Sequence, residues 1–154
     1  EEVEKVYQDS CEFVDFVFLP KETKVAYVAL CVVVCESLPV VMKWAKANGL
    51  GHMDAQGVVS SDQFRALLFE RFQTIAAAKK LQRFMWIQKA HNIHAEYQAV
   101  GYQEQWVGGI ACANGQKEQL LTATFKARRS QLDQYFAPVY PKLYPDRPAD
   151  HILP

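Results

Sequence analysis

The hydrophobic pattern of this chain is dominated by one stretch, Val25–Val34, in which no residue carries a charge. Because neither face of such a segment is marked as wet, water must be excluded from nearly all of its sides. Its five valines and one tyrosine favour a strand, whereas its continuation into the KWAKA pattern favours a helix. We predict a helix that continues to Gly49 and is kinked near Leu38, because Pro39 removes a backbone donor and clashes with the preceding turn.

Apolar residues also recur at helical spacing in several other segments of the chain, which cover residues 3–17, 64–75, 81–94 and 116–136. We therefore expect an all-α fold, a single-domain helical bundle of four to six helices around the kinked apolar central helix, formed by residues 1–137. The glycine-rich stretch 101–115 is expected to be an ordered loop or a short element folded onto this bundle. Residues 138–154, rich in proline and tyrosine, are expected to form an extended tail packed on it.

Composition and charge narrow the class of protein. The chain has 154 residues, a length that fits one globular domain. Half of its residues, 50%, are hydrophobic and 22% are charged, and this composition excludes disorder for most of the chain. Its 17 basic and 17 acidic residues cancel, so no global field attracts nucleic acid, and we predict no nucleic-acid partner. The basic cluster of Lys126, Arg128 and Arg129 is expected to be a solvated helix face.

A membrane span is the other interpretation of the apolar stretch. Val25–Met42 is about eighteen residues long, the lower limit for a spanning helix. Glu36 and Pro39 inside the stretch and a mean hydropathy of -0.14 for the chain argue against it. The chain opens at Glu1 with neither an initiator methionine nor the profile of a signal peptide, which favours a processed or trimmed product.

The predicted kink suggests a pocket for an apolar small molecule. The pocket would form where Pro39 opens the predicted helix, and Glu36 lies at that break. Trp44 and Phe72 are the large apolar side chains expected near the pocket. A carboxylate is rarely buried without a partner, so Glu36 is expected to be solvated at the rim. The alternative is that burial raises its pKa and fits it for proton or cation chemistry.

Two histidines are the strongest chemical candidates in the sequence. If 81–94 is a helix, His91 and His94 lie one turn apart on the same face, whereas Glu96 points away from them. Such a pair can ligate a transition metal or haem, or titrate together. No third ligand is placed on the same helix, so the alternative is a pair of surface or hydrogen-bonded histidines.

The proline-rich C-terminal segment is the candidate contact surface for a partner protein. Prolines alternate with tyrosines there, and an extended polyproline conformation loses little entropy on docking into an aromatic groove. The alternative is that the segment lies across its own bundle and its tyrosines anchor it. The predicted partner-binding residues are Tyr140, Pro141, Tyr144 and Pro145.

The loop after Gly49 carries a further motif. A loop with Asp54 and Gly57, followed by apolar Val59 and a new helix at Phe64, resembles a degenerate EF-hand. That resemblance implies a helix–loop–helix unit, but glutamine or histidine replaces the expected acidic ligands at His52, Gln56 and Gln63. Calcium needs six to eight oxygen ligands, so we expect an ordinary turn here, with Ser60 and Gln63 as a capping box, or a helix pair that binds no metal.

No local catalytic signature is present. The phosphate-loop, dinucleotide-binding, GxSxG and HExxH patterns are all absent, which leaves open whether the chain is an enzyme. The cysteines are too few for a disulfide scaffold and are expected to be buried thiols: Cys11, Cys31, Cys35 and Cys112. We predict first a non-catalytic protein-interaction module, such as an adaptor, inhibitor, effector or assembly subunit with a protein partner. The alternatives are a metal or haem protein using His91 and His94, and an apolar-ligand carrier.

Overall fold

A three-stranded sheet lies at the centre of the molecule, whose computed structural model describes residues 2–21 and 25–146. The strands are β1 (Phe16–Phe18), β2 (Leu30–Val34) and β3 (Ile93–Tyr97), in that order across the sheet. β1 is antiparallel to β2, and β3 is parallel to it. A hairpin elsewhere pairs β4 (Ile110–Ala111) with β5 (Lys117–Glu118). The all-α prediction is therefore wrong, and the fold is mixed α/β.

The valine-rich segment is the middle strand of this sheet and not a helix. Every residue of β2 is 0% exposed. Leu30, Val32 and Val34 face one core, and Cys31 and Val33 face the other. A strand buried on both faces needs no alternation of polar residues, and β-branched side chains suit its pleated backbone. The missing polar face that we attributed to a buried helix is thus equally the mark of a central strand.

Pro39 begins a helix and does not bend one. Ser37 is the N-cap residue of α2 (Leu38–Ala47), and Pro39 lies in the first turn of this helix. The amide that proline lacks would have no intrahelical partner at that position, and its fixed φ suits the helical start. The predicted kinked helix is therefore a strand followed by a separate helix.

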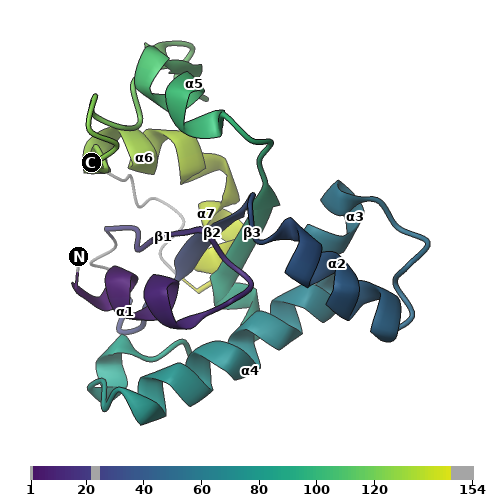
Figure 1. The fold of residues 1–154 in the computed structure, drawn as a ribbon. Helices are drawn as coiled ribbons and strands as arrows, with labels where there is room; N and C mark the ends of the chain where they lie inside the picture. The colour runs from purple at the N-terminus through teal and green to yellow at the C-terminus, as the bar shows by residue number, and fades with distance from the viewer. Residues whose placement is uncertain (1, 22–24, 147–154) are drawn as a thin grey trace.

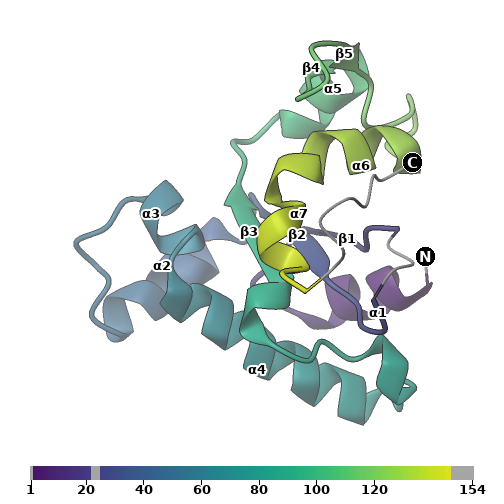
Figure 2. The same cartoon turned by 180° about the vertical axis from the view of Figure 1, so that it is seen from behind.

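Helices cover both faces of the sheet (Figures 1 and 2). One face is covered by α1 (Glu2–Ser10), α2, α3 (Ala55–Val59) and α4 (Asp62–Ala78), and we call the apolar cluster there the α4 core. The opposite face carries α5 (Tyr102–Gly108), α6 (Arg129–Phe136) and α7 (Tyr140–Leu143), which enclose the α6 core. The connection from β2 to β3 runs through α2, α3 and α4, as a parallel pair requires a long crossover.

The flanking segments match the predicted helices only in part. α4 confirms the helix expected from Phe64, with Ser61 as its cap, whose hydroxyl accepts from Phe64 N at 3.1 Å. The helix expected over 3–17 ends at Ser10. The remaining predictions fail where short elements replace long helices. These are η1 (Arg83–Met85), η2 (Ala90–Asn92) and β3 within 81–97, and β5 and α6 within 116–136. The short helix α5 agrees with the short element that was one expectation for 101–115.

The loop that resembles an EF-hand forms a helix cap. The Asp54 carboxylate accepts a hydrogen bond from Gly57 N at 2.8 Å and starts α3, so it is committed to the backbone. Across residues 2–21 and 25–146, no group of three or more histidine, cysteine or acidic side chains could hold a metal ion. The capping box that we expected at Ser60 and Gln63 is wrong, because Ser61 caps α4 and Ser60 ends α3.

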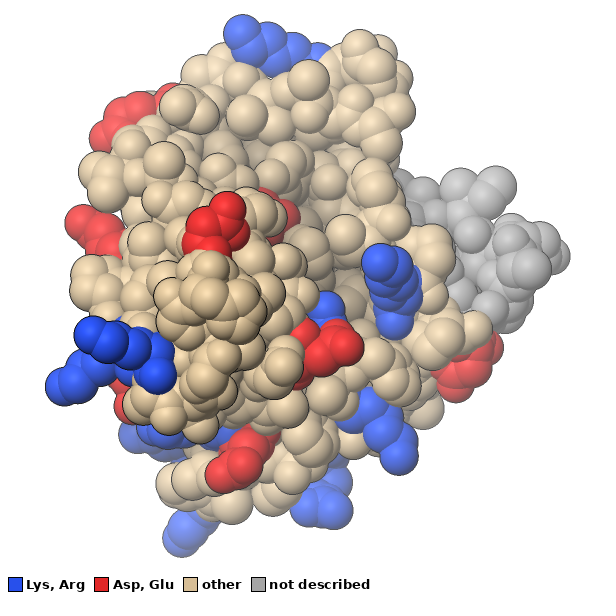
Figure 3. All heavy atoms as spheres, turned by 90° about the vertical axis from the view of Figure 1, so that its right-hand side faces the viewer, with Lys and Arg blue, Asp and Glu red and all other residues tan. Residues whose placement is uncertain are grey.

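The face of the molecule shown in Figure 3 carries charges of both signs. No helix in the described part of the chain is long and apolar enough to cross a membrane. On the face shown in Figure 3, lysine and arginine side chains alternate with aspartate and glutamate and do not gather into a patch of one sign. All four cysteines are free, with Cys11, Cys31 and Cys35 buried and Cys112 half-buried.

Candidate functional site

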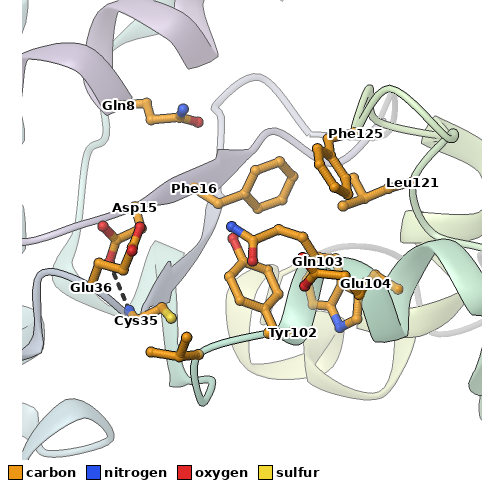
Figure 4. Close-up of a pocket in the computed structure, with 13 residues that line it drawn as sticks. Gln8, Asp15, Phe16, Cys35, Glu36, Tyr102, Gln103, Glu104, Leu121 and Phe125 are labelled. Atoms are coloured by element: carbon orange, nitrogen blue, oxygen red, sulfur yellow. Dashed lines mark hydrogen bonds between the residues drawn. The ribbon is translucent and has the colours of Figure 1, made fainter.

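A groove of about 440 Å³ opens beside β1 and the start of α5, and we call it the β1 groove. Figure 4 shows Asp15, Glu36 and Cys35 at one end of it, Leu121 and Phe125 at the other, and Phe16 between them. Segments far apart in the sequence meet here, because the β2–α2 turn and the β3–α5 connection leave the same end of the sheet. The lining residues are Gln8, Asp15, Phe16, Cys35, Glu36, Val100, Gly101, Tyr102, Gln103, Glu104, Trp106, Leu121 and Phe125.

Asp15 fixes the acidic end of the groove. Its Oδ2 accepts hydrogen bonds from Cys35 N at 2.7 Å and from Ser37 N at 2.9 Å, and its Oδ1 accepts one from Ser37 Oγ at 3.0 Å. The carboxylate therefore holds the β2–α2 turn in place. Burial raises the pKa of the neighbouring Cys35 thiol, so this sulfur stays protonated and is a poor nucleophile.

We expect Asp15→Ala to destabilise the protein by about 1–3 kcal/mol, because it leaves buried amides of the β2–α2 turn without an acceptor. Urea denaturation followed by circular dichroism measures the change. Glu36→Ala is the matched control, since Glu36 is exposed on the same turn, and it should lie within about 0.5 kcal/mol of the native protein. Equal effects of the two substitutions would contradict the role of Asp15.

Aromatic side chains form the wall of the groove. Phe16 contacts Trp106 edge-to-face, with ring centroids 5.8 Å apart, and Trp106 in turn contacts Tyr102 at 5.0 Å. Phe125 lies across from them and is 52% exposed. An exposed phenylalanine on an ordered element offers a flat face on which a planar ligand or an apolar partner side chain can pack.

The turn that presents Phe125 is tightly hydrogen-bonded. Thr122 N donates to Lys126 O at 2.8 Å, and the Thr122 hydroxyl accepts from Lys126 N at 3.1 Å. Leu121 and Ala127 form a bridge at its base. Phe125 adopts a φ of 65°, a left-handed conformation that costs a residue with a side chain about 1–2 kcal/mol. Such strain persists only where the surrounding contacts enforce it, so the direction of this turn is fixed.

Lys126 extends from this turn into a second hollow of about 630 Å³, which shares Gln8 and Phe16 with the β1 groove. The other two cationic side chains that line this hollow each form an ion pair with an acidic side chain. Lys5 Nζ lies 3.1 Å from Asp9, and Arg129 pairs with Glu4 through both of its terminal nitrogens. Within residues 2–21 and 25–146, Lys126 makes no ion pair, so its ammonium is available to an anion.

The two hollows together combine an aromatic surface with an available cation. This combination suits a ligand with a planar part and an anionic part, because the ring stacks and the ammonium attracts the charge. The predicted helix over 116–136 hid this arrangement, since it assigned Lys126 to a solvated face. The sequence feature that indicates this turn is the cluster of small and polar residues around Thr122–Thr124.

The described structure does not bring together the three residues of the predicted apolar pocket. Glu36 lies on the β1 groove, but Trp44 and Phe72 belong to the α4 core. Phe72 is fully buried against Tyr7, with ring centroids 5.0 Å apart, and Trp44 packs on Phe64 at 5.8 Å. Glu36 therefore lies apart from the two aromatic residues, and Pro39, in the first turn of α2, opens no kink between them.

The predicted histidine pair lies on η2 and β3, and not on a helix. His91 is exposed in η2, while His94 is in β3, where residues two apart share a face. His94 Nε2 therefore lies 2.8 Å from Glu96 Oε1, which corrects our expectation that Glu96 points away. Glu96 Oε2 accepts further hydrogen bonds from Tyr135 Oη at 2.6 Å and Gln98 Nε2 at 2.7 Å. Metal or haem binding by His91 and His94 stays a prediction.

The hydrogen bonds to Glu96 predict a pH-dependent contribution to stability. Burial alone would raise the pKa of this carboxyl, but the hydrogen bonds from His94, Tyr135 and Gln98 outweigh burial and lower the pKa below 4.5. The folded protein therefore binds this proton more weakly than the unfolded chain does. The stabilisation is present above about pH 4.5 and is lost as the pH falls through the lowered pKa.

We expect Glu96→Gln to destabilise the protein most at neutral pH and progressively less below pH 4.5. Chemical denaturation of both proteins at a series of pH values measures the difference in free energy of unfolding. The exposed Glu104, on α5, provides the control substitution Glu104→Gln, which should change the free energy of unfolding at neutral pH by less than about 0.5 kcal/mol. A Glu96→Gln difference that grows on acidification would contradict the sign.

The predicted partner-binding segment is folded against the sheet. Residues 137–143 form η3 (Ala137–Val139) and α7, with prolines in the first turn of each. Tyr140 is 0% exposed and Tyr144 1%, whereas Pro141 and Pro145 are exposed. The expected extended conformation is thus absent from 138–143, because proline starts a helical turn as readily as it favours polyproline. Residues 147–154 lie outside the described part.

Comparison with known proteins gives a fold and no family. Neither protein-family models nor curated proteins match the chain. Among solved structures, the adenylation domain of the carboxylate reductase from Mycobacterium chelonae is similar, with a TM-score of 0.63 and 16% identity over 94% of this chain and 17% of that chain. The A domain of carboxylic acid reductase from Segniliparus rugosus, solved with AMP and a co-purified carboxylic acid, gives 0.51 and 15% over the same shares. The chain thus has the fold of a segment that makes up 17% of each of these chains.

Proposed function

We propose that this chain is the small unit of a module that activates a carboxylic acid with ATP. In this reaction a carboxylate oxygen attacks the α-phosphorus of ATP, the bond to the β-phosphate breaks, and pyrophosphate leaves, which gives an acyl adenylate. The observation that carries the proposal is the fold similarity over 94% of this chain to an adenylation domain. Fold alone does not assign chemistry, so the local geometry has to supply further support.

Lys126 supplies that support. Negative charge builds on the phosphorus-bound oxygens as the acid attacks, and a cation held in a fixed position stabilises it. Lys126 lies on a strained, hydrogen-bonded turn and is free of ion pairs within the described residues. The exposed ring of Phe125 beside it offers a stacking surface to a base or to an acyl group.

A larger body would complete the site in this proposal. The chain spans about 17% of the length of the adenylation-domain chains that it resembles, and the β1 groove is open. Its rim carries Val100, which is 81% exposed, and Phe125. Large apolar side chains exposed together favour contact with another surface. We assign most of the ATP-binding and acid-binding walls to that body and one cationic wall to this chain.

Acid-dependent exchange of radiolabelled pyrophosphate into ATP tests the proposal. The native protein that carries this chain is incubated with ATP and a panel of aliphatic and aromatic carboxylic acids, and acyl adenylate is trapped separately with hydroxylamine. We expect exchange with at least one acid class and hydroxamate formation with the same class. Absence of both, in a folded protein and across the panel, contradicts the proposal.

The second candidate is the non-catalytic interaction module, as an adaptor, inhibitor, effector or assembly subunit. The exposed pair Val100 and Phe125 on one groove also favours this function, since aromatic and apolar residues are enriched in interfaces. A stoichiometric partner that co-purifies with the protein, combined with no pyrophosphate exchange, distinguishes it from the first candidate. Val100→Ser should then weaken the complex, because it removes an exposed apolar contact and little of the fold.

A further inference from the structure

We propose that a third cavity, separate from the β1 groove and from the hollow beside it, binds a small organic carboxylate with an apolar body. This cavity, which we call the His91 cavity, measures about 670 Å³ and lies where the start of α4, the start of β3 and α7 meet. Its volume is in the range of small-molecule sites. It is lined by Ser60, Asp62, Arg65, His91, Ile93, His94, Ala95, Val139, Lys142, Leu143 and Pro145, and shares none of them with the β1 groove.

The charges on the His91 cavity favour an anion. Its one carboxylate, Asp62, lies 2.6 Å from Arg65 Nη1 and is neutralised by it. Arg65 Nε donates to Ile93 O at 3.1 Å, so Nη2 is used by neither bond. Lys142 is exposed on α7 and makes no ion pair within the described residues. A planar guanidinium and an ammonium that line the same cavity are suitable donors for a carboxylate.

The floor of the cavity is apolar and buried. Ile93 and Leu143 are each 1% exposed, and Ala95 is 7% exposed, with Val139 at the edge. An inorganic anion would gain nothing from this floor, whereas the alkyl or aryl group of a ligand removes its own apolar surface from water by packing there, at about 25 cal/mol per Å². The combination of a cationic rim and an apolar floor therefore selects an amphipathic acid over a simple ion.

One of the two imidazoles of this cavity is already hydrogen-bonded to a carboxylate. His94 Nε2 is held by Glu96 Oε1 at 2.8 Å, and no group of three candidate ligands forms in the described chain. His91 is exposed at the rim, where it can donate a hydrogen bond to the same carboxylate. The two residues that the sequence singled out thus lie on one cavity, and an organic anion uses their donors better than a cation does.

Calorimetric titration with octanoate, without ATP, tests this site on the native protein. We expect saturable binding, at least tenfold weaker binding of octanamide, which has the same chain without the charge, and no measurable binding of inorganic phosphate. Lys142→Glu should weaken octanoate binding at least tenfold, while Lys46→Glu, an exposed lysine on α2, should leave it within twofold. Amide signals of Ile93–Ala95 should shift in NMR spectra on addition of octanoate.

Three outcomes overturn the proposal. Equal affinity for octanamide would make the site merely apolar, and equal affinity for phosphate would make it a simple anion site. Octanoate-induced shifts confined to the β1 groove would place the ligand elsewhere. Lys126→Ala, which should slow the proposed adenylation, should leave octanoate binding in the His91 cavity unchanged. The two proposals can therefore fail independently, one in the exchange assay and the other in the octanoate titration.

Discussion

Replacing Lys126 with alanine should lower the rate of acid-dependent adenylate formation by about a hundredfold or more, because loss of one positioned donor to a developing negative charge commonly has that effect. Its ammonium is not committed to an ion pair within the described chain, and the Thr122 hydrogen bonds hold its backbone. Pyrophosphate exchange with saturating ATP and acid measures the loss. Because Lys126 is exposed, the free energy of unfolding should stay within about 0.5 kcal/mol of the native value.

Two substitutions control the Lys126 experiment. Lys126→Arg keeps the charge and should retain part of the rate, although the guanidinium places its donors differently. Lys5→Ala removes another cation of the same hollow, one already paired with Asp9, and should change the rate by less than about threefold. A Lys5→Ala loss equal to that of Lys126→Ala would indicate a general electrostatic effect and would count against a specific role for Lys126.

Trp106→Ala should destabilise the protein by about 3–5 kcal/mol, the usual cost of truncating a buried tryptophan. Trp106 is 1% exposed and joins the groove wall to the α6 core, where its ring contacts Tyr135 at 5.4 Å as well as Phe16 and Tyr102. The substitution removes these contacts and leaves a cavity that the sheet cannot close. Guanidinium denaturation followed by circular dichroism measures the change.

Phe84→Ala is the matched control for Trp106, since this aromatic side chain is 58% exposed. Its effect should be within about 0.5 kcal/mol. If the two substitutions destabilise equally, the α6 core is not organised around Trp106. If Trp106→Ala is nearly neutral, the arrangement of α5 against the sheet is wrong, and with it the geometry of the β1 groove.

The central prediction from the sequence failed because one pattern has two physical solutions. A segment with no polar face is buried on all sides as a helix or on both faces as a strand. The five valines pointed to the strand, and the KWAKA pattern belonged to the next element, α2, which begins at Leu38. The same error, a helix predicted where the chain forms a strand, made Glu96 point away from His94. Side chains two residues apart point to opposite sides of a helix but to the same face of a strand.

The candidate site was less predictable than the fold. Glu36 was the one residue of the predicted pocket that lies on the β1 groove. Phe125 and Lys126 were hidden by an apparent helical stripe, since the spacing of Leu121 and Phe125 fits a helix as well as it fits a closed turn. Only hydrogen bonds within the turn, which depend on the Thr122 hydroxyl, distinguish these two conformations.

The sequence by itself determined local properties, namely the apolar stretch that must be buried and the α4 helix that begins near Phe64. The tertiary structure decided which elements meet. β2 is buried because helices from both ends of the chain cover its two faces, and the β1 groove exists because the turn after β2 and the connection after β3 leave the same end of a parallel pair. Such contacts depend on strand pairing between residues about sixty positions apart, which local periodicity does not encode.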